Sequence, residues 1–232
     1  MTRPASEHAL REAVVATARE MNALSINRGK SGNVSARFAN ARFAGYLITP
    51  TGLPYAQTLA TDIVAMPLDG DLSAAIGTRL PSSEWRFHRD IYRARPEVGG
   101  IVHTHAPFAT TLACVGRGIP AFHYMVAAAG GTDIRCAPYA TFGTQALSDH
   151  AVAALAGRRA CLLAQHGMIA VGATLAQALA LAVEVETLAE MYWRALQVGE
   201  PPILADDEMR VVLEKFARYG QPQQAASGTG RG

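Results

Sequence analysis

The order of strand-like and helix-like segments is the feature that most limits how this chain can fold. Short apolar runs predict strands, and longer runs with apolar residues at helical spacing predict helices. Predicted strands cover residues 33–38, 45–49, 63–66, 100–105, 119–123, 134–138, 160–165 and 168–171. Predicted helices cover residues 6–24, 82–94, a segment that starts at Pro107, 144–156, 174–198 and 206–219. Adjacent short strands with helices at both ends and in mid-chain favour a single-domain, three-layer α/β/α fold with a central mixed, largely antiparallel sheet.

Composition limits the number of domains and the kinds of partner. The 232 residues, 50% of them hydrophobic, suit one domain over 1–220, and the Gln/Gly/Ser-rich tail 221–232 is expected to be disordered. The net charge is +2 and no basic run occurs, so nucleic acid is not an expected partner. No apolar stretch is long enough for a membrane span or a signal core. A membrane partner is therefore not expected, and the expected location is cytoplasmic. The charged fraction, 17%, is low and indicates a surface partly covered by partner subunits.

The cysteines carry little sign of a site. Cys114, Cys136 and Cys161 are far apart and show no C-x-x-C spacing. An odd number at such spacing argues against a disulfide framework and against a zinc site built from cysteines. Each cysteine lies in an apolar context, so all three are predicted to be core residues.

Two histidines on one predicted strand are the most informative local feature. Side chains alternate along Ile-Val-His-Thr-His, residues 101–105, so His103 and His105 point the same way. They can ligate one metal, or they can be ordinary strand histidines that face solvent or hydrogen-bond in the core. His166, at another strand end before Gly167, is either a third ligand or a turn residue. Three histidines and a carboxylate would suit zinc with a position left for water or substrate.

Three segments of small residues have the composition of an anion site: Ser31-Gly32-Asn33, Thr51-Gly52 and Ser82-Ser83. Glycine lets backbone N–H groups approach an anion, and a helix N-terminus offers free N–H groups with a favourable dipole. Taken alone, each segment is explained more simply as a turn or a helix cap. Glu84, in the first turn of the helix predicted from Ser82, either offsets the helix dipole or serves as the carboxylate of the metal site.

Seven segments, taken together and in this order, resemble a known family. They are Gly-Lys-Ser-Gly-Asn-Val-Ser (29–35), Leu-Ile-Thr-Pro-Thr-Gly (47–52), Leu-Pro-Ser-Ser-Glu-Trp-Arg-Phe-His (80–88), Val-His-Thr-His (102–105), Pro-Ala-Phe-His-Tyr-Met-Val-Ala-Ala-Ala-Gly-Gly (120–131), Ala-Pro-Tyr-Ala-Thr-Phe-Gly-Thr (137–144) and Gln-His-Gly-Met-Ile-Ala (165–170). Through them the chain resembles the class II aldolase/adducin family from about residue 8 to residue 220. A joint match of this kind is far more specific than any single motif.

The resemblance implies a metal site and two catalytic residues. The metal is Zn²⁺, with Mn²⁺ or Co²⁺ as alternatives, and its ligands are His103, His105 and His166. Glu84 stands where the family has its catalytic carboxylate, which also caps the empty metal site. Tyr124 matches a catalytic tyrosine that reaches in from a neighbouring subunit. The family's aldolases are typically homotetramers with sites between subunits.

The resemblance also implies how the two ends of a sugar phosphate are bound. The phosphate-binding positions are Gly32, Asn33, Thr51, Gly52, Ser82 and Ser83. Phe142 matches a position on the aldehyde side of the substrate, and Tyr219 matches a tyrosine on a C-terminal segment at the same side. His88, four residues after Glu84 and therefore on the same helix face, is predicted to pack beside it without a direct role. Trp85 is predicted to be a packing or interface residue.

The implied reaction is the reversible cleavage of a ketose 1-phosphate into dihydroxyacetone phosphate and a small aldehyde. Candidate substrates are L-fuculose 1-phosphate, 5-deoxyribulose 1-phosphate and 5-methylthioribulose 1-phosphate, and few pocket contacts distinguish their aldehydes. Family epimerases, dehydratases and decarboxylases are alternatives. The epimerases carry His-Ala-Asp-Tyr-Phe where this chain has His-Tyr-Met-Val-Ala from His123, which favours cleavage. A non-enzymatic, adducin-like assembly module is a further alternative, against which the histidines and Glu84 argue.

Overall fold

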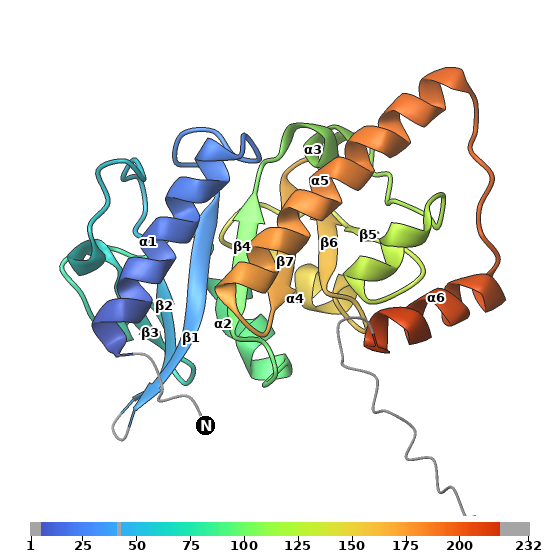
Figure 1. The fold of residues 1–232 in the computed structure, drawn as a ribbon. Coiled ribbons are helices and arrows are strands. Elements are labelled where there is room, and N and C mark those ends of the chain that lie inside the picture. The colour runs from blue at the N-terminus through green and yellow to red at the C-terminus, as the bar shows by residue number, and fades with distance from the viewer. Residues whose placement is uncertain (1–5, 41–42, 219–232) are drawn as a thin grey trace, which may run out of the picture.

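The computed structural model of the chain describes residues 6–40 and 43–218, which fold around a seven-stranded sheet (Figure 1). The strands are β1 (Asn33–Asn40), β2 (Phe43–Ile48), β3 (Val64–Pro67), β4 (Gly100–Thr104), β5 (Arg135–Ala137), β6 (Ala160–Leu163) and β7 (Gly167–Gly172). Their order across the sheet is β3-β2-β1-β4-β7-β6-β5. Strands β5 and β6 pair in parallel, and the other neighbours pair antiparallel. The predicted mixed, largely antiparallel sheet is therefore confirmed.

Helices cover both faces of this sheet, as a three-layer α/β/α fold requires. They are α1 (Glu7–Ala23), α2 (Trp85–Ala94), α3 (Pro107–Cys114), α4 (Gln145–Ala154), α5 (Leu175–Val198) and α6 (Asp206–Arg218), with the 3₁₀ helices η1 (Ala60–Asp62), η2 (Leu72–Ala74) and η3 (Tyr124–Ala129). Figure 1 shows α1 and α5 crossing one face of the sheet. The apolar residues of α1, α3 and α5 form one core with that face, and those of α2 and α4 form a second core with the opposite face.

Alternation along the strands builds the two cores and also places the first histidine. In β4, Val102 belongs to the core of α1, α3 and α5, whereas Ile101 belongs to the core of α2 and α4. Each fully buried Ile or Val side chain contributes about 1.5 to 3 kcal/mol to folding. His103 has the same orientation as Ile101, since residues two apart in a strand share a face. It therefore points to the face that α2 covers.

Several predicted helix starts are confirmed. The side chains of Ser6 and Thr174 each accept a backbone N–H group of the first turn at 3.2 Å, as expected for N-caps. Pro107 is the first residue of α3. Glu186 of α5 accepts the next two backbone N–H groups of α3, both at 2.8 Å, and its carboxylate thus stabilises the helix N-terminus.

Helix α2 begins later than predicted, at Trp85, with Glu84 at its N-cap position. The N–H group of Ser82 donates to the carbonyl oxygen of Thr49 at 3.0 Å, and the residue before Ser82 forms a β-bridge to the same turn. Because these contacts hold the backbone extended, the Ser-Ser pair precedes the helix instead of opening it. Trp85 is 3% exposed, which fits its predicted packing role.

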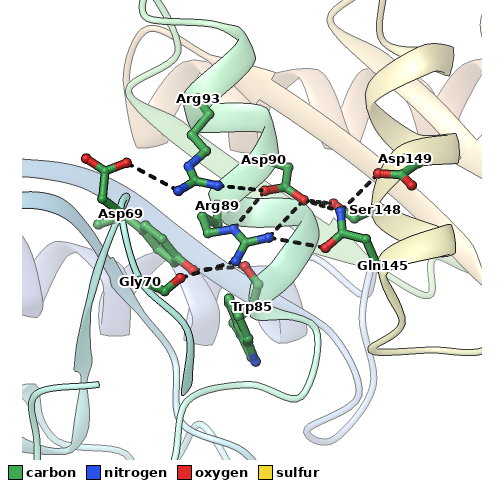
Figure 2. Close-up of polar contacts among 10 residues, drawn as sticks. Asp69, Gly70, Trp85, Arg89, Asp90, Arg93, Gln145, Ser148 and Asp149 are labelled. Atoms are coloured by element: carbon green, nitrogen blue, oxygen red, sulfur yellow. Dashed lines mark hydrogen bonds and ion pairs between the residues drawn. The ribbon is translucent and has the colours of Figure 1, made fainter. Parts of the chain in front are cut away.

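A network of polar groups holds α2 against α4 (Figure 2). Asp90 of α2 accepts hydrogen bonds from Arg89 at 2.7 Å, from Gln145 at 2.6 Å and from Ser148 at 2.7 Å. Hydrogen bonds to a charged group contribute about 1.5 to 3 kcal/mol each, more than neutral ones. The network therefore fixes the helix whose N-cap is Glu84.

The segment 119–123 does not form the predicted strand. Ile119 makes an isolated β-bridge with Ile134, and η3 follows soon after. Pro120 has no N–H group with which to extend the ladder, which explains why the pairing stops.

The prediction that all three cysteines are core residues is wrong for Cys114. Cys114 is exposed at the last position of α3, Cys136 is partly buried and Cys161 is buried. Neighbours in a helix sequence lie on different sides of it, so the buried Ala113 does not bury Cys114.

The C-terminal predictions fall at the limit of the described residues. Helix α6 is described to Arg218, and Tyr219 and the tail 221–232 lie outside the described residues. Within residues 6–40 and 43–218, no helix combines the length and apolarity that crossing a membrane requires.

Candidate metal centre

The three histidines singled out in the sequence meet at one end of β4 and β7. His103 lies in β4, His105 follows that strand, and His166 lies in the turn between β6 and β7. Thr104 pairs with Met168 across β4 and β7, and this register brings the turn beside the end of β4. One ligand nitrogen from each histidine lies within 4.8 Å of the others. The arrangement depends on how β4 and β7 pair, and the spacing of the histidines in the sequence does not predict that pairing.

A hydrogen bond determines which nitrogen of His103 faces this centre. His103 is fully buried, and its Nδ1 lies 2.9 Å from the carbonyl oxygen of Met168. A carbonyl oxygen only accepts, so Nδ1 carries a hydrogen and Nε2 is the nitrogen that faces the centre. Histidines that ligate metals are commonly oriented by such a bond.

Glu84 reaches the same centre from the N-cap position of α2. Its Oε2 lies 3.1 Å from Nε2 of His103, and its Oε1 lies 3.2 Å from Nε2 of His166. Asn33 donates from Nδ2 to Oε2 at 3.0 Å. Burial raises the pKa of Glu84, but His103 and His166 lower it by more, so the pKa lies below its usual value. Glu84 is therefore a carboxylate at neutral pH.

Three buried polar atoms at this centre have no hydrogen-bond partner in the described part of the chain: Glu84 Oε1, His103 Nε2 and His105 Nε2. Burial, together with the neighbouring His103 and His166, lowers the pKa of His105 to about 4, so this ring is neutral at pH 7. Buried polar atoms without a partner are rare because they cost free energy. Three imidazoles and one carboxylate match the donor set of a zinc-type site. The residues present thus fit a divalent metal ion.

A cavity of about 280 Å³ opens beside the centre. It is lined by Ser31, Ser83, Glu84, His105, Tyr139, Ala140, Phe142, Gln165 and His166. The predicted residues Ser83 and Phe142 therefore share one cavity with two of the histidines and with Glu84. Sequence reasoning missed Tyr139 and Gln165. Their positions in the sequence could have indicated them, since Tyr139 lies in the same family-like segment as Phe142 and Gln165 directly precedes His166.

Hydrogen bonds join the three small-residue loops. Lys30 donates from Nζ to the carbonyl oxygen of Gly52 at 3.0 Å, and the N–H group of Thr51 donates to the carbonyl oxygen of Leu80 at 3.0 Å. Gly52 has φ 71°, in the left-handed region that glycine adopts without strain. The first and third loops each contribute a serine to the cavity. The loops are neighbours, and their role in binding phosphate stays a prediction.

Two of the predicted phosphate positions have side chains engaged elsewhere. Asn33 is 2% exposed and contacts Glu84 and His88, and Ser82 accepts the N–H group of Glu84 on its Oγ at 3.3 Å. Neither side chain lines the cavity. The sequence did not show that Asn33 turns toward Glu84, because the two residues lie far apart along the chain.

Tyr124 lies in η3 and is 51% exposed. Within one chain it lines a separate hollow between η3 and α6, not the cavity beside Glu84. Its predicted catalytic role requires Tyr124 of a neighbouring subunit and stays a prediction. Tyr219, predicted for the aldehyde side, is outside the described residues.

Gly32 has no room for a side chain, which leads to a prediction. A Cβ atom would lie 2.5 Å from the carbonyl oxygen of His103 and 2.8 Å from Oδ1 of Asn27. We expect Gly32→Ala to lower the free energy of unfolding by about 1 to 3 kcal/mol, because the strand with the metal ligands must shift. Urea unfolding measures this change.

The matched control is Gly199→Ala, where nothing lies within 4 Å of the added Cβ. It should unfold at the wild-type urea concentration. Equal stability of the Gly32→Ala and Gly199→Ala proteins would contradict the close approach of Gly32 to β4.

The sequence profile of the Class II Aldolase and Adducin N-terminal domain matches residues 12–193 of this chain. The chain belongs to this family. A 5-methylthioribulose-1-phosphate/5-deoxyribulose-1-phosphate aldolase of Rhodospirillum rubrum is 57% identical over 97% of this chain and 98% of that protein. An L-fuculose phosphate aldolase of Escherichia coli K12 is 49% identical over 89% of this chain and 94% of that protein. Among solved structures, an L-fuculose 1-phosphate aldolase has a TM-score of 0.85 and 38% identity, covering 92% of this chain and 98% of that one.

These likenesses confirm the predicted family, fold and class of enzyme. The chain is a class II aldolase, and its similarity to L-fuculose phosphate aldolases agrees with the motifs quoted from the sequence. The family is metal-dependent, in agreement with the cluster of His103, His105 and His166. The sheet with helices on both faces is the fold of the similar structures.

Proposed function

We propose that this class II aldolase uses zinc to cleave a 5-deoxypentulose 1-phosphate, either 5-methylthioribulose 1-phosphate or 5-deoxyribulose 1-phosphate. The products are dihydroxyacetone phosphate and a small aldehyde, and the cleavage is reversible. The position of Glu84 among three imidazoles beside a cavity carries the proposal. The relative from R. rubrum supports these substrates ahead of L-fuculose 1-phosphate.

The donor set supports zinc as the metal. His103, His105 and His166 would supply three neutral imidazoles and Glu84 a carboxylate, all of them ligands that zinc takes in catalytic sites. Manganese or cobalt could take the same ligands, with affinities that follow the usual order of divalent metals. When bound, the metal supplies a Lewis acid that stabilises the negative charge developing on the ketone fragment.

Glu84 would move a proton that the cleavage requires. Breaking the bond between C3 and C4 leaves an electron pair on C3, while the C4 hydroxyl loses its proton and becomes a carbonyl. Glu84 begins as a carboxylate, so it would first take up a proton, equivalent to the one that the C4 hydroxyl releases, and would then deliver it to C3 to complete dihydroxyacetone phosphate. In the direction of synthesis it would remove that proton from C3. Its side chain lines the cavity, so a substrate there lies within its reach.

The joined loops would hold the phosphate end of the substrate. Ser82 and Ser83 directly precede α2, whose first N–H groups favour an anion. Hydrogen bonds connect the loop of Thr51 and Gly52 to Leu80 on one side and to Lys30, near Gly32, on the other. The loops are rigid because hydrogen bonds connect them. Phosphate binding energy would therefore orient the reacting bond relative to Glu84 and the metal.

A homotetramer with sites between subunits would complete the active site. Tyr124, Tyr139 and Phe142 are 51%, 57% and 65% exposed in the single chain, which is unusual for large aromatic side chains. Together with the low charged fraction of 17%, this exposure supports a surface that neighbouring subunits cover. In such an assembly, Tyr124 of a neighbour would handle the proton of the C4 hydroxyl.

A panel of ketose 1-phosphates tests the proposed substrate. We expect kcat/KM for 5-deoxyribulose 1-phosphate to exceed that for L-fuculose 1-phosphate by about 10- to 100-fold. The C5 hydroxyl of the fuculose compound would be brought against Ala140 and the ring of Phe142, where it loses water. Release of dihydroxyacetone phosphate, detected with a coupled dehydrogenase, measures each rate.

The outcomes separate the substrate from the reaction. A higher kcat/KM for L-fuculose 1-phosphate would contradict the assigned substrate and leave the aldolase reaction intact. Epimerised or dehydrated products, without dihydroxyacetone phosphate from any member of the panel, would contradict the proposed reaction itself.

A further inference from the structure

A hydrogen-bonded network of buried polar side chains, which we call the polar chain, lies behind Glu84, on the side away from the cavity. Asn33 and Ser35 come from β1, two residues apart and therefore on one face, and His88 and Tyr92 come from successive turns of α2. None of the four is more than 2% exposed. They lie beside the rings of Tyr46 and Phe87, in the core between α2 and the sheet.

Continuous hydrogen bonds connect these side chains to Glu84. Tyr92 Oη lies 2.9 Å from Ser35 Oγ, which lies 2.7 Å from Nδ1 of His88. Nε2 of His88 contacts Oδ1 of Asn33, and Nδ2 of Asn33 donates to Oε2 of Glu84 at 3.0 Å. Apart from the bond to Glu84, the side chains of these four residues form hydrogen bonds only with one another among the described residues.

The orientation of the Asn33 amide determines the direction of every bond in the polar chain. Its nitrogen donates to Oε2 of Glu84, so its oxygen faces His88. That oxygen only accepts, so His88 carries its hydrogen on Nε2. Burial, and to a lesser extent His103, lowers the pKa of His88 to about 3, so the ring is neutral and its Nδ1 must accept from Ser35. Ser35 in turn accepts from Tyr92.

We propose that Asn33 and His88 are positioning residues that hold Oε2 of Glu84 as a fixed acceptor and leave Oε1 for proton transfer. Oε1 is the oxygen nearer to His166, which lines the cavity, and it has no hydrogen-bond partner within the described residues. Oε2 faces His103, which does not line the cavity. The inference rests on the proposed role of Glu84 and reassigns the side chain of Asn33 from the phosphate to the carboxylate.

The polar chain is suited to this task because each donor is itself fixed. Both neighbours hold the Asn33 amide in one orientation, because a flipped amide would turn its oxygen to Oε2 of Glu84 and its nitrogen to the Nε2–H group of His88. Ser35 contacts the other ring nitrogen and holds His88 in the tautomer that donates to Asn33. A buried polar network that is complete in this way specifies one arrangement, whereas an incomplete one is costly.

Two substitutions of His88 test the inference. His88→Phe keeps a ring of similar size but removes both hydrogen bonds, and we expect kcat to fall by about 30- to 100-fold with KM within about threefold of wild type. His88→Gln can still donate from its amide to Asn33, and we expect it to recover kcat to within about fivefold of wild type. The control is Tyr46→Phe, which removes a buried hydrogen bond to the Trp85 carbonyl oxygen in the same core.

A spectroscopic measurement tests the same inference without activity, substrate or metal. Nitrogen-detected NMR of the metal-free protein should show a signal from a neutral histidine ring protonated on Nε2 that is lost in His88→Gln, and this loss assigns the signal to His88. An Nδ1–H tautomer would overturn the proposed direction of the polar chain, even if His88→Phe fails to fold. A His88→Phe enzyme with the kcat of Tyr46→Phe would overturn the positioning role. A normal kcat for Glu84→Gln would instead defeat the proposed function, so the two failures are distinguishable.

Discussion

Replacing Glu84 with glutamine should lower kcat by about a thousandfold, the middle of the range for loss of a general acid or base. Glutamine has nearly the same shape, and its amide oxygen can still accept from Nδ2 of Asn33. The neutral amide cannot take up a proton, so it can neither protonate C3 of the substrate nor remove a proton from it. The three histidines remain, so the protein should keep its metal. Steady-state rates and metal analysis by mass spectrometry measure both quantities.

Glu186→Gln provides a matched control at another partly buried glutamate. Glu186 accepts two N–H groups of α3 and does not line the cavity, so its replacement should change stability while kcat stays near wild type. A Glu84→Gln enzyme with kcat within tenfold of Glu186→Gln would remove Glu84 from proton transfer. Loss of metal together with activity would instead make Glu84 chiefly a metal ligand.

The elements of the fold follow from local patterns in the sequence wherever no distant contact competes. Alternation along β4 assigns Ile101 and Val102 to opposite cores, and a serine, a threonine and a proline mark where helices begin. The predicted start of α2 at Ser82 was wrong because the hydrogen bond from Ser82 to Thr49 overrides the capping preference of the Ser-Ser pair. That bond joins residues on different loops, and no local pattern contains it.

The candidate site was predictable in part for the same reason. Alternation shows that His103 and His105 point the same way, but the approach of His166 depends on the register of β4 and β7. The family resemblance supplied what periodicity lacked. Neither periodicity nor the family resemblance predicted the contact between Asn33 and His88. It joins β1 to α2, and no motif contains both residues.

Removing the metal should abolish cleavage, and adding zinc should restore it. Without the ion, the buried Nε2 atoms of His103 and His105 and Oε1 of Glu84 have no partner in the described chain, and no Lewis acid remains to stabilise charge on the ketone fragment. Metal bound to the folded state also stabilises it, by about 3 kcal/mol when free zinc is about 100-fold above its dissociation constant. Chelation should therefore lower both the rate and the melting temperature, which thermal unfolding with and without zinc will show.

Two variants separate loss of the site from a general effect of chelation. His103→Ala should lack bound zinc and gain no stability when zinc is added, because one of the three imidazoles of the cluster is gone. His8→Ala, at an exposed position in α1, should bind zinc and respond to chelation as wild type does. The buried polar atoms without a partner and the metal dependence of the family both indicate one ion held by these imidazoles. A chelated protein with the turnover rate of the untreated protein would therefore contradict both the metal site and the proposed reaction.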